Sequence, residues 1–84
     1  MTTLLSYGQF CEHMVSDLGI DQEWLEIPFA EMPGFDSLRM FELDLSLEEL
    51  GAMLPEHEFA SLTSLRDAYD AYVACIASSQ QHAP

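Results

Sequence analysis

The sequence predicts an all-α fold: a small helical bundle of three long helices and one short helix. Apolar residues recur at helical spacing in three long segments, and no segment alternates apolar and polar residues as a strand would. Hydrophobic residues make up 49% of the 84 residues, enough to form a core. The length allows one core only, so we expect a single domain over residues 1–84.

The first helix is expected from Thr3 to Leu18, with Gly19 as its stop. Its apolar positions fall mostly three or four apart: Leu4, Leu5, Cys11, Met14, Val15 and Leu18. Residues 19–36 lose this period and contain two glycines and two prolines, so they predict a long structured loop with a single helical turn over 21–25. A loop of this length in a small domain is more often functional or well packed than idle.

The second helix is expected to begin at Asp36 or Ser37, since either side chain can cap it. It should run to Leu50, where Gly51 ends it. At about 100° per residue, this helix has two apolar stripes on opposite sides. One is predicted to face the core and contains Met40, Leu43, Leu47 and Leu50. The other contains Leu38, Phe41 and Leu45.

Polar stripes separate the two apolar ones, so the second apolar stripe has acids along both edges. One polar stripe holds Arg39, Glu42, Ser46 and Glu49, and the other holds Ser37, Asp44 and Glu48. A three-helix bundle can cover only one apolar stripe. The second stripe is therefore either buried by a central placement of the helix or exposed as a docking face for basic partners.

Residues 56–60 are long enough for one short helix only. A last helix is expected through Ser78, capped by Thr63 or Ser64, and residues 79–84 are expected to be a flexible C-terminal tail. The apolar face of this helix is predicted to contain Leu65, Tyr69, Tyr72, Val73 and Ile76.

The charge is strongly acidic, because fifteen Asp and Glu face only Arg39 and Arg66, for a formal net charge of −13. Such a surface repels phosphate backbones and anionic headgroups, which excludes nucleic-acid and membrane-surface binding. It favours a protein partner with a basic docking surface, in an encounter that salt weakens.

Cysteine and histidine spacing predicts no metal or redox site. Cys11 and Cys75 belong to no CxxC or Cys/His pattern and are expected to be small buried hydrophobic residues. The three histidines are single and scattered, and are expected at the surface: His13, His57 and His82. The N-terminus lacks a basic export segment, and no window reaches the length of a membrane span. We therefore expect a soluble, cytoplasmic monomer.

The segment Gly34-Phe35-Asp36-Ser37-Leu38 opens an acidic helix that continues with Glu42-Leu43 and Leu47-Glu48-Glu49. It resembles the phosphopantetheine attachment motif of the acyl carrier protein family. The order of the expected elements is similar to that of the family over nearly the whole chain. The resemblance implies one carrier domain, in which a phosphopantetheinyl transferase uses coenzyme A to esterify Ser37 with phosphopantetheine.

The arm would hold an acyl or aminoacyl group as a thioester, and Asp36 and Leu38 would flank its attachment point. Asp36 would help the transferase to recognise the site. Loading, condensing or transferring enzymes with basic surfaces would dock on a partner face that comprises Leu38, Phe41, Glu42, Asp44, Leu45, Glu48 and Glu49.

Two differences from the family point to a specialised pathway. Arg39 stands where many fatty-acid carriers have an acid, and the segment from Leu47 to Gly51 is one residue shorter than theirs. The resemblance therefore implies a discrete carrier of polyketide, nonribosomal-peptide or related biosynthesis.

Two other classes of function share parts of this sequence pattern. Phe35-Asp36-Ser37-Leu38 is similar to the Gly-Asp-Ser-Leu block of some esterases, but the chain is too short for a positioned base and an oxyanion pocket, so we expect no enzyme. The alternative is an acidic helical interaction module without a prosthetic group, in which Asp36 and Ser37 only cap a helix.

Overall fold

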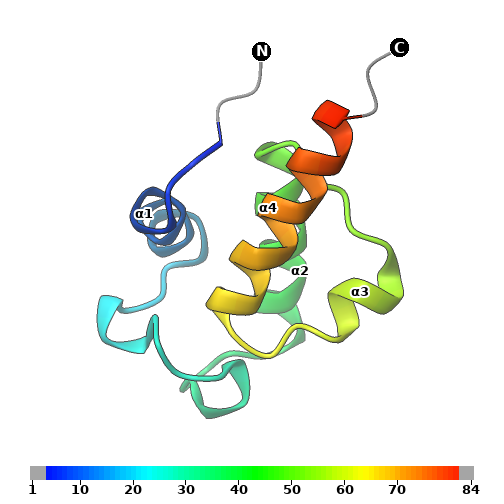
Figure 1. The fold of residues 1–84 in the computed structure, drawn as a ribbon. Coiled ribbons are helices and arrows are strands. Elements are labelled where there is room, and N and C mark those ends of the chain that lie inside the picture. Colours follow the sequence, from blue (N-terminus) through cyan, green and yellow to red (C-terminus); the bar gives the residue numbers. More distant parts are fainter. Residues whose placement is uncertain (1–3, 82–84) are drawn as a thin grey trace.

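The computed structural model describes residues 4–81, and for residues 79–81 the backbone only. It contains four α-helices, and no strand occurs within this range. They are α1 (Tyr7–Leu18), α2 (Ser37–Glu49), α3 (Glu56–Ala60) and α4 (Leu65–Gln81). The predicted all-α architecture of three long helices and one short one is confirmed. In Figure 1, α1 is viewed nearly along its axis, whereas α2 and α4 run up the page and α3 lies to one side.

Helix α1 begins four residues later than predicted. Ser6 is its N-cap in an extended conformation: the Ser6 hydroxyl accepts a hydrogen bond from Gln9 N, and the Gln9 side chain accepts one from Ser6 N. This capping box satisfies two amides at the helix start, so residues before Ser6 stay outside the helix. The predicted stop is correct, because Gly19 takes the left-handed conformation with φ of 68°.

The loop between α1 and α2 is built on the core rather than extended away from it. It forms two 3₁₀ turns, η1 (Gln22–Trp24), where one turn was predicted, and η2 (Phe29–Glu31), which was not. Three of its apolar side chains are buried in the core: Ile20, Phe29 and Met32. The Phe29 amide also donates a 2.8 Å hydrogen bond to the Thr63 carbonyl, which ties the loop to the start of α4.

Helix α2 has nearly the predicted bounds, with Asp36 as its N-cap and a turn at Leu50 and Gly51 after its last residue. The short helix over 56–60 is also as predicted. At the start of α4, the Ser64 hydroxyl accepts a hydrogen bond from Asp67 N. The end of α4 was predicted too early, since the helix passes Ser78 and continues to Gln81. The rest of the expected tail, residues 82–84, lies outside the described range.

The core lies between α1, α2 and α4, with residues of the long loop closing one side. Leu43 and Leu47 of the predicted inward stripe are buried, and Met40 and Leu50 pack against them partly buried. The fully buried Phe10 was not among the predicted core positions of the first helix. The other buried hydrophobic residues of the three helices are Cys11, Met14, Leu18, Leu65, Ala68, Tyr72 and Ile76.

Two tyrosines of α4 anchor the segment before α1. The Tyr72 hydroxyl accepts a 3.0 Å hydrogen bond from Leu5 N, and the Tyr69 hydroxyl donates a 2.9 Å hydrogen bond to the Leu5 carbonyl. These bonds satisfy polar groups that the core would otherwise leave unpaired. The prediction of two buried cysteines is correct for Cys11, whereas Cys75 is only half-buried.

Candidate functional site

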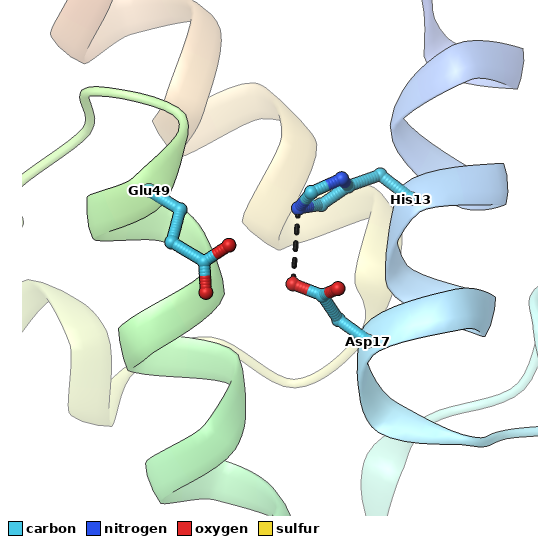
Figure 2. A group of neighbouring side chains, drawn as sticks. All are labelled: His13, Asp17 and Glu49. Carbon is cyan, nitrogen blue, oxygen red and sulfur yellow. Dashed lines mark ion pairs between the residues drawn. The ribbon is translucent and has the colours of Figure 1, made fainter.

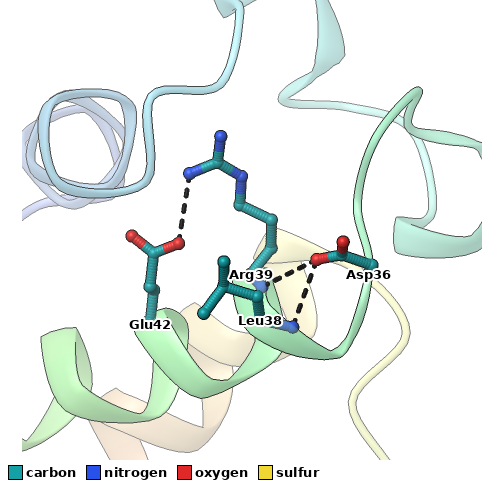
Figure 3. A network of polar contacts seen from close by, with 4 residues as sticks. All are labelled: Asp36, Leu38, Arg39 and Glu42. Carbon is teal, nitrogen blue, oxygen red and sulfur yellow. Dashed lines mark hydrogen bonds and ion pairs between the residues drawn. The ribbon is translucent and has the colours of Figure 1, made fainter.

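Ser37 is the first residue of α2 and its side chain is exposed. The helix is capped by the residue before it: Asp36 Oδ1 accepts hydrogen bonds from Leu38 N at 3.1 Å and from Arg39 N at 3.2 Å (Figure 3). Because Asp36 provides the cap, the Ser37 hydroxyl is not needed to hold the helix start. Ser37 therefore presents a primary hydroxyl at the positive end of a thirteen-residue helix.

The charges around Ser37 are largely paired within α2. Arg39 Nη1 lies 3.1 Å from Glu42 Oε1, and Figure 3 shows the guanidinium turned toward Glu42, away from the Asp36 carboxylate. Two amides of the first turn are already bound to Asp36. An anion attached to Ser37 would therefore gain the helix dipole, worth about 0.3–1 kcal/mol at an exposed site, without a clamp of side chains.

A stacked aromatic pair lies in the loop just before Ser37. The rings of Phe29 and Phe35 are stacked, with centroids 4.6 Å apart and planes 4° from parallel. The Phe35 amide donates a 3.2 Å hydrogen bond to the Met32 carbonyl, and Gly34 between them has a φ of 74°. Only glycine takes this left-handed conformation readily, so Gly34 sets the direction from which the chain enters α2.

A pocket of about 540 Å³ opens directly beside Ser37. Its lining combines the long loop, the start of α2 and the segment before α4: Pro28, Phe29, Ala30, Phe35, Asp36, Ser37, Met40, Leu62 and Thr63. Most of these side chains are apolar, so the pocket offers an apolar surface next to the Ser37 hydroxyl. The sequence assigned only capping roles to this region around Thr63, because nothing in it indicates that it meets the loop.

The second apolar stripe of α2 is exposed. Leu38 is 63% exposed, Phe41 58% and Leu45 42%, so the alternative of a centrally buried helix is wrong. Among residues 4–78, the other large hydrophobic residues with comparable exposure are Leu4 and Met53. Three exposed apolar side chains on one helix face form a patch of the kind that marks a binding surface.

The acidic residues of the predicted partner face border this patch unequally. Glu48 and Glu49 are exposed, and Asp44 and Glu42 are half-buried. Glu42 is paired with Arg39, and Figure 2 shows the Glu49 carboxylate turned toward α1. Asp44 and Glu48, which share a polar stripe with Ser37, form no ion pair with the other described residues.

The polar stripe that contains Ser46 lies against α1, which the sequence did not predict. Ser46 is 1% exposed, and its hydroxyl donates a 2.8 Å hydrogen bond to Asp17 Oδ2. The expected surface position of His13 is also wrong, because this side chain is half-buried and its Nε2 lies 3.1 Å from Asp17 Oδ2. His57 is exposed as predicted, and His82 lies outside the described residues.

A larger groove of about 860 Å³ lies between α3 and α4, on residues that do not include Ser37. The half-buried Cys75 is part of its wall, and its thiol lies 3.8 Å from the Met53 carbonyl. Its size exceeds that of the Ser37 pocket, but no reactive constellation accompanies it.

Comparison of the chain with protein-family models, with curated proteins and with solved structures found no match. No helix within residues 4–81 has both the length and the apolarity that crossing a membrane requires.

Proposed function

We propose that the chain is a carrier protein of the acyl carrier type, which holds acyl or aminoacyl thioesters on a phosphopantetheine arm at Ser37. The observation that carries the proposal is the position of Ser37. It is an exposed hydroxyl at the first position of α2, between an apolar pocket and the exposed stripe of Leu38, Phe41 and Leu45. A helix cap alone would require none of these neighbours.

The residues at this site fit a covalent phosphodiester. The Ser37 Oγ would form a bond to the phosphorus of coenzyme A's pantetheine phosphate, the pyrophosphate bond would break, and adenosine 3′,5′-bisphosphate would leave. The transferase would take the Ser37 proton, since no histidine of the described residues lines the pocket. The negative charge is then placed at the positive end of the helix dipole.

The weak hold on this anion suits the proposed function. Asp36 uses one oxygen to bind two amides, and the Arg39 guanidinium is paired with Glu42, so neither side chain clamps the phosphate. When bound, the arm would supply the thiol that carries the acyl group. The pocket beside Ser37 gives that group an apolar surface to contact between encounters with enzymes.

Partner enzymes would dock on the exposed stripe next to the arm. Leu38, Phe41 and Leu45 would supply the apolar centre of the interface, and Asp44 and Glu48 would select basic partners. A net charge of −13 would also accelerate the encounter with a basic surface. The proposal includes no catalysis by the chain itself, and we place it in polyketide, nonribosomal-peptide or related specialised biosynthesis.

Mass spectrometry of the intact protein tests the proposal. Incubation with coenzyme A and a broad-specificity phosphopantetheinyl transferase should add one phosphopantetheine to the wild type and none to Ser37→Ala. Ser61→Ala, which removes another exposed serine, is the matched control and should be modified like the wild type. A wild type that stays unmodified while circular dichroism shows it folded would leave the acidic interaction module as the better description.

A further inference from the structure

Three potential metal ligands converge where α1 meets α2. His13 and Asp17 lie one turn apart on α1, and Glu49 is the last residue of α2. Each offers one ligand atom, and these atoms all lie within 4.8 Å of one another. Figure 2 shows the three side chains pointing into the space between the two helices.

The imidazole of His13 lacks a satisfying partner within the described residues. Its Nε2 is shielded from solvent and makes no hydrogen bond to them, although Asp17 Oδ2 is only 3.1 Å away. The nitrogen is therefore close to the carboxylate but not aligned with it. A buried ring nitrogen without an aligned partner calls for an explanation, and a bound ion is one of the standard explanations.

The carboxylate of Asp17 is held in place by an outer contact. The buried Ser46 donates its 2.8 Å hydrogen bond to Asp17 Oδ2, the same oxygen that lies beside His13 Nε2. Hydrogen bonds of this kind orient the ligands of protein metal sites and reduce the rearrangement that binding requires. Glu49 is exposed, so an ion can enter from solvent on its side.

We infer that His13, Asp17 and Glu49 form a binding site for a divalent transition-metal ion of the zinc class, which bridges α1 and α2. One imidazole nitrogen and two carboxylate oxygens are a donor set that zinc accepts, with water in the fourth position. Magnesium, in contrast, prefers octahedral coordination by oxygen alone. Small side-chain rotations would place each donor atom about 2.0–2.2 Å from the ion, which is the usual length of zinc–nitrogen and zinc–oxygen bonds.

The strongly acidic chain supports cation binding at this place but does not by itself distinguish zinc from other cations. The imidazole supplies that distinction. Sequence spacing did not indicate the site, because Glu49 joins the other two ligands only through the packing of α2 on α1. The inference is independent of any modification of Ser37, and the unmodified protein suffices to test it.

Isothermal titration of the reduced, full-length protein with zinc chloride, in a background of excess magnesium chloride, tests the site. One saturable zinc site is expected in the wild type. His13→Gln and Glu49→Gln should each weaken zinc binding by more than about tenfold, the loss that even an outer-shell change produces. Ser46→Ala should weaken it by about tenfold.

Matched controls distinguish this site from other donors. His57→Gln removes an exposed histidine of α3, and Cys75→Ala removes the more accessible thiol; both should bind zinc like the wild type. With cobalt(II) as the probe, the near-ultraviolet spectrum should lack thiolate-to-metal charge transfer.

Three results would overturn the inference. They are the absence of saturable zinc binding, a zinc affinity of folded His13→Gln equal to that of the wild type, and displacement of the bound zinc by excess magnesium. If His13→Gln does not fold, Glu49→Gln decides, since its side chain is exposed.

Discussion

The Ser46 hydroxyl donates a hydrogen bond to the Asp17 carboxylate across the contact between α2 and α1, at an Oγ–Oδ2 distance of 2.8 Å. Ser46 is the one polar residue in the core within the part of the chain described, and this bond satisfies its hydroxyl. The contact adds a directional hydrogen bond to the apolar packing between the two helices.

Removing this hydroxyl should destabilise the fold modestly. Ser46→Ala loses a net hydrogen bond, worth about 0.5–1.5 kcal/mol, and Asp17 is exposed enough to be solvated instead. Ser16→Ala is the matched control, because it makes the same change at an exposed position of α1 and carries the same gain in helix propensity. Urea denaturation should give Ser46→Ala the lower free energy of unfolding of the two. Equal values would mean that the bond contributes nothing to stability.

Phe41→Ala should leave the fold intact. The side chain is exposed, so its removal opens no cavity and should change the free energy of unfolding by less than about 0.5 kcal/mol. Leu43→Ala, two residues further along the same helix, removes a fully buried side chain and should cost about 2–5 kcal/mol. Thermal melts followed by circular dichroism measure both. A Phe41→Ala variant as unstable as Leu43→Ala would place Phe41 in the core.

Partner docking should depend on the same exposed stripe and on the acids beside it. In a loading assay with the phosphopantetheine form, Phe41→Ala should slow transfer from a partner enzyme, because an aromatic anchor is lost. Glu48→Lys should slow transfer further, and added salt should bring the transfer rate of Glu48→Lys closer to that of the wild type. Glu23→Lys, an exposed acid on η1, is the matched charge reversal. If it slows transfer equally, the net charge rather than this face governs docking.

Alkaline pH should destabilise the protein through two groups near the start of α1. Burial raises the pKa of the Tyr7 hydroxyl from 10.0 to about 12 and also raises the pKa of the Cys11 thiol above 9.0. Each group holds its proton more firmly in the folded state, so its contribution is full below the unfolded pKa and is lost as pH rises through the folded pKa. Stability should therefore fall from about pH 9 to pH 12.

Urea denaturation of reduced protein across this range measures the fall. Tyr7→Phe should make the free energy of unfolding fall less steeply with pH above about pH 10, because the substitution removes a group that binds its proton more tightly in the folded state. A slope identical to that of the wild type would show that Tyr7 does not take part. Cys11→Ala should make this fall less steep nearer to about pH 9.

Salt should stabilise the fold, because fifteen acidic residues face only two arginines. The melting temperature should rise between low salt and roughly 0.15 M as screening reduces repulsion. Mild acid should act in the same direction. Asp67 limits this stabilisation by acid. Hydrogen bonds from the Thr63 side chain and amide lower the pKa of the Asp67 carboxyl, so its contribution to stability is present above pH 3.8 and is lost as the pH falls through the lowered pKa. A melting temperature that salt leaves unchanged would mean that the carboxylates are well compensated.

The sequence was most informative where local rules decide the structure. Gly19 and Gly51 mark two helix ends correctly, and the two stripes of α2 separate into a buried one and an exposed one as their spacing indicates. The start of α1 was also readable, because Ser6 followed by Gln9 is a capping-box pattern. The predicted start at Thr3 is too early because the apolar Leu4 and Leu5 continue the helical spacing on the N-terminal side of Ser6.

What the sequence could not provide depends on contacts between distant segments. Ser46 looks like a surface residue in any periodic pattern, and only Asp17 on another helix explains its burial. The pocket beside Ser37 likewise needs Leu62 and Thr63, which meet the loop through the bond from Phe29. Pairings of this kind follow from tertiary packing, which single-residue preferences do not encode.

That bond from Phe29 to the Thr63 carbonyl has a consequence for protein synthesis. A chain emerges from the ribosome with its N-terminus first, so Ser37 is made before the residues that complete the wall beside it. Until Thr63 and α4 follow, the nascent chain has neither the pocket nor the closed core. The wall beside Ser37 is therefore completed only after the segment that contains Thr63 has been synthesised and has packed against the loop.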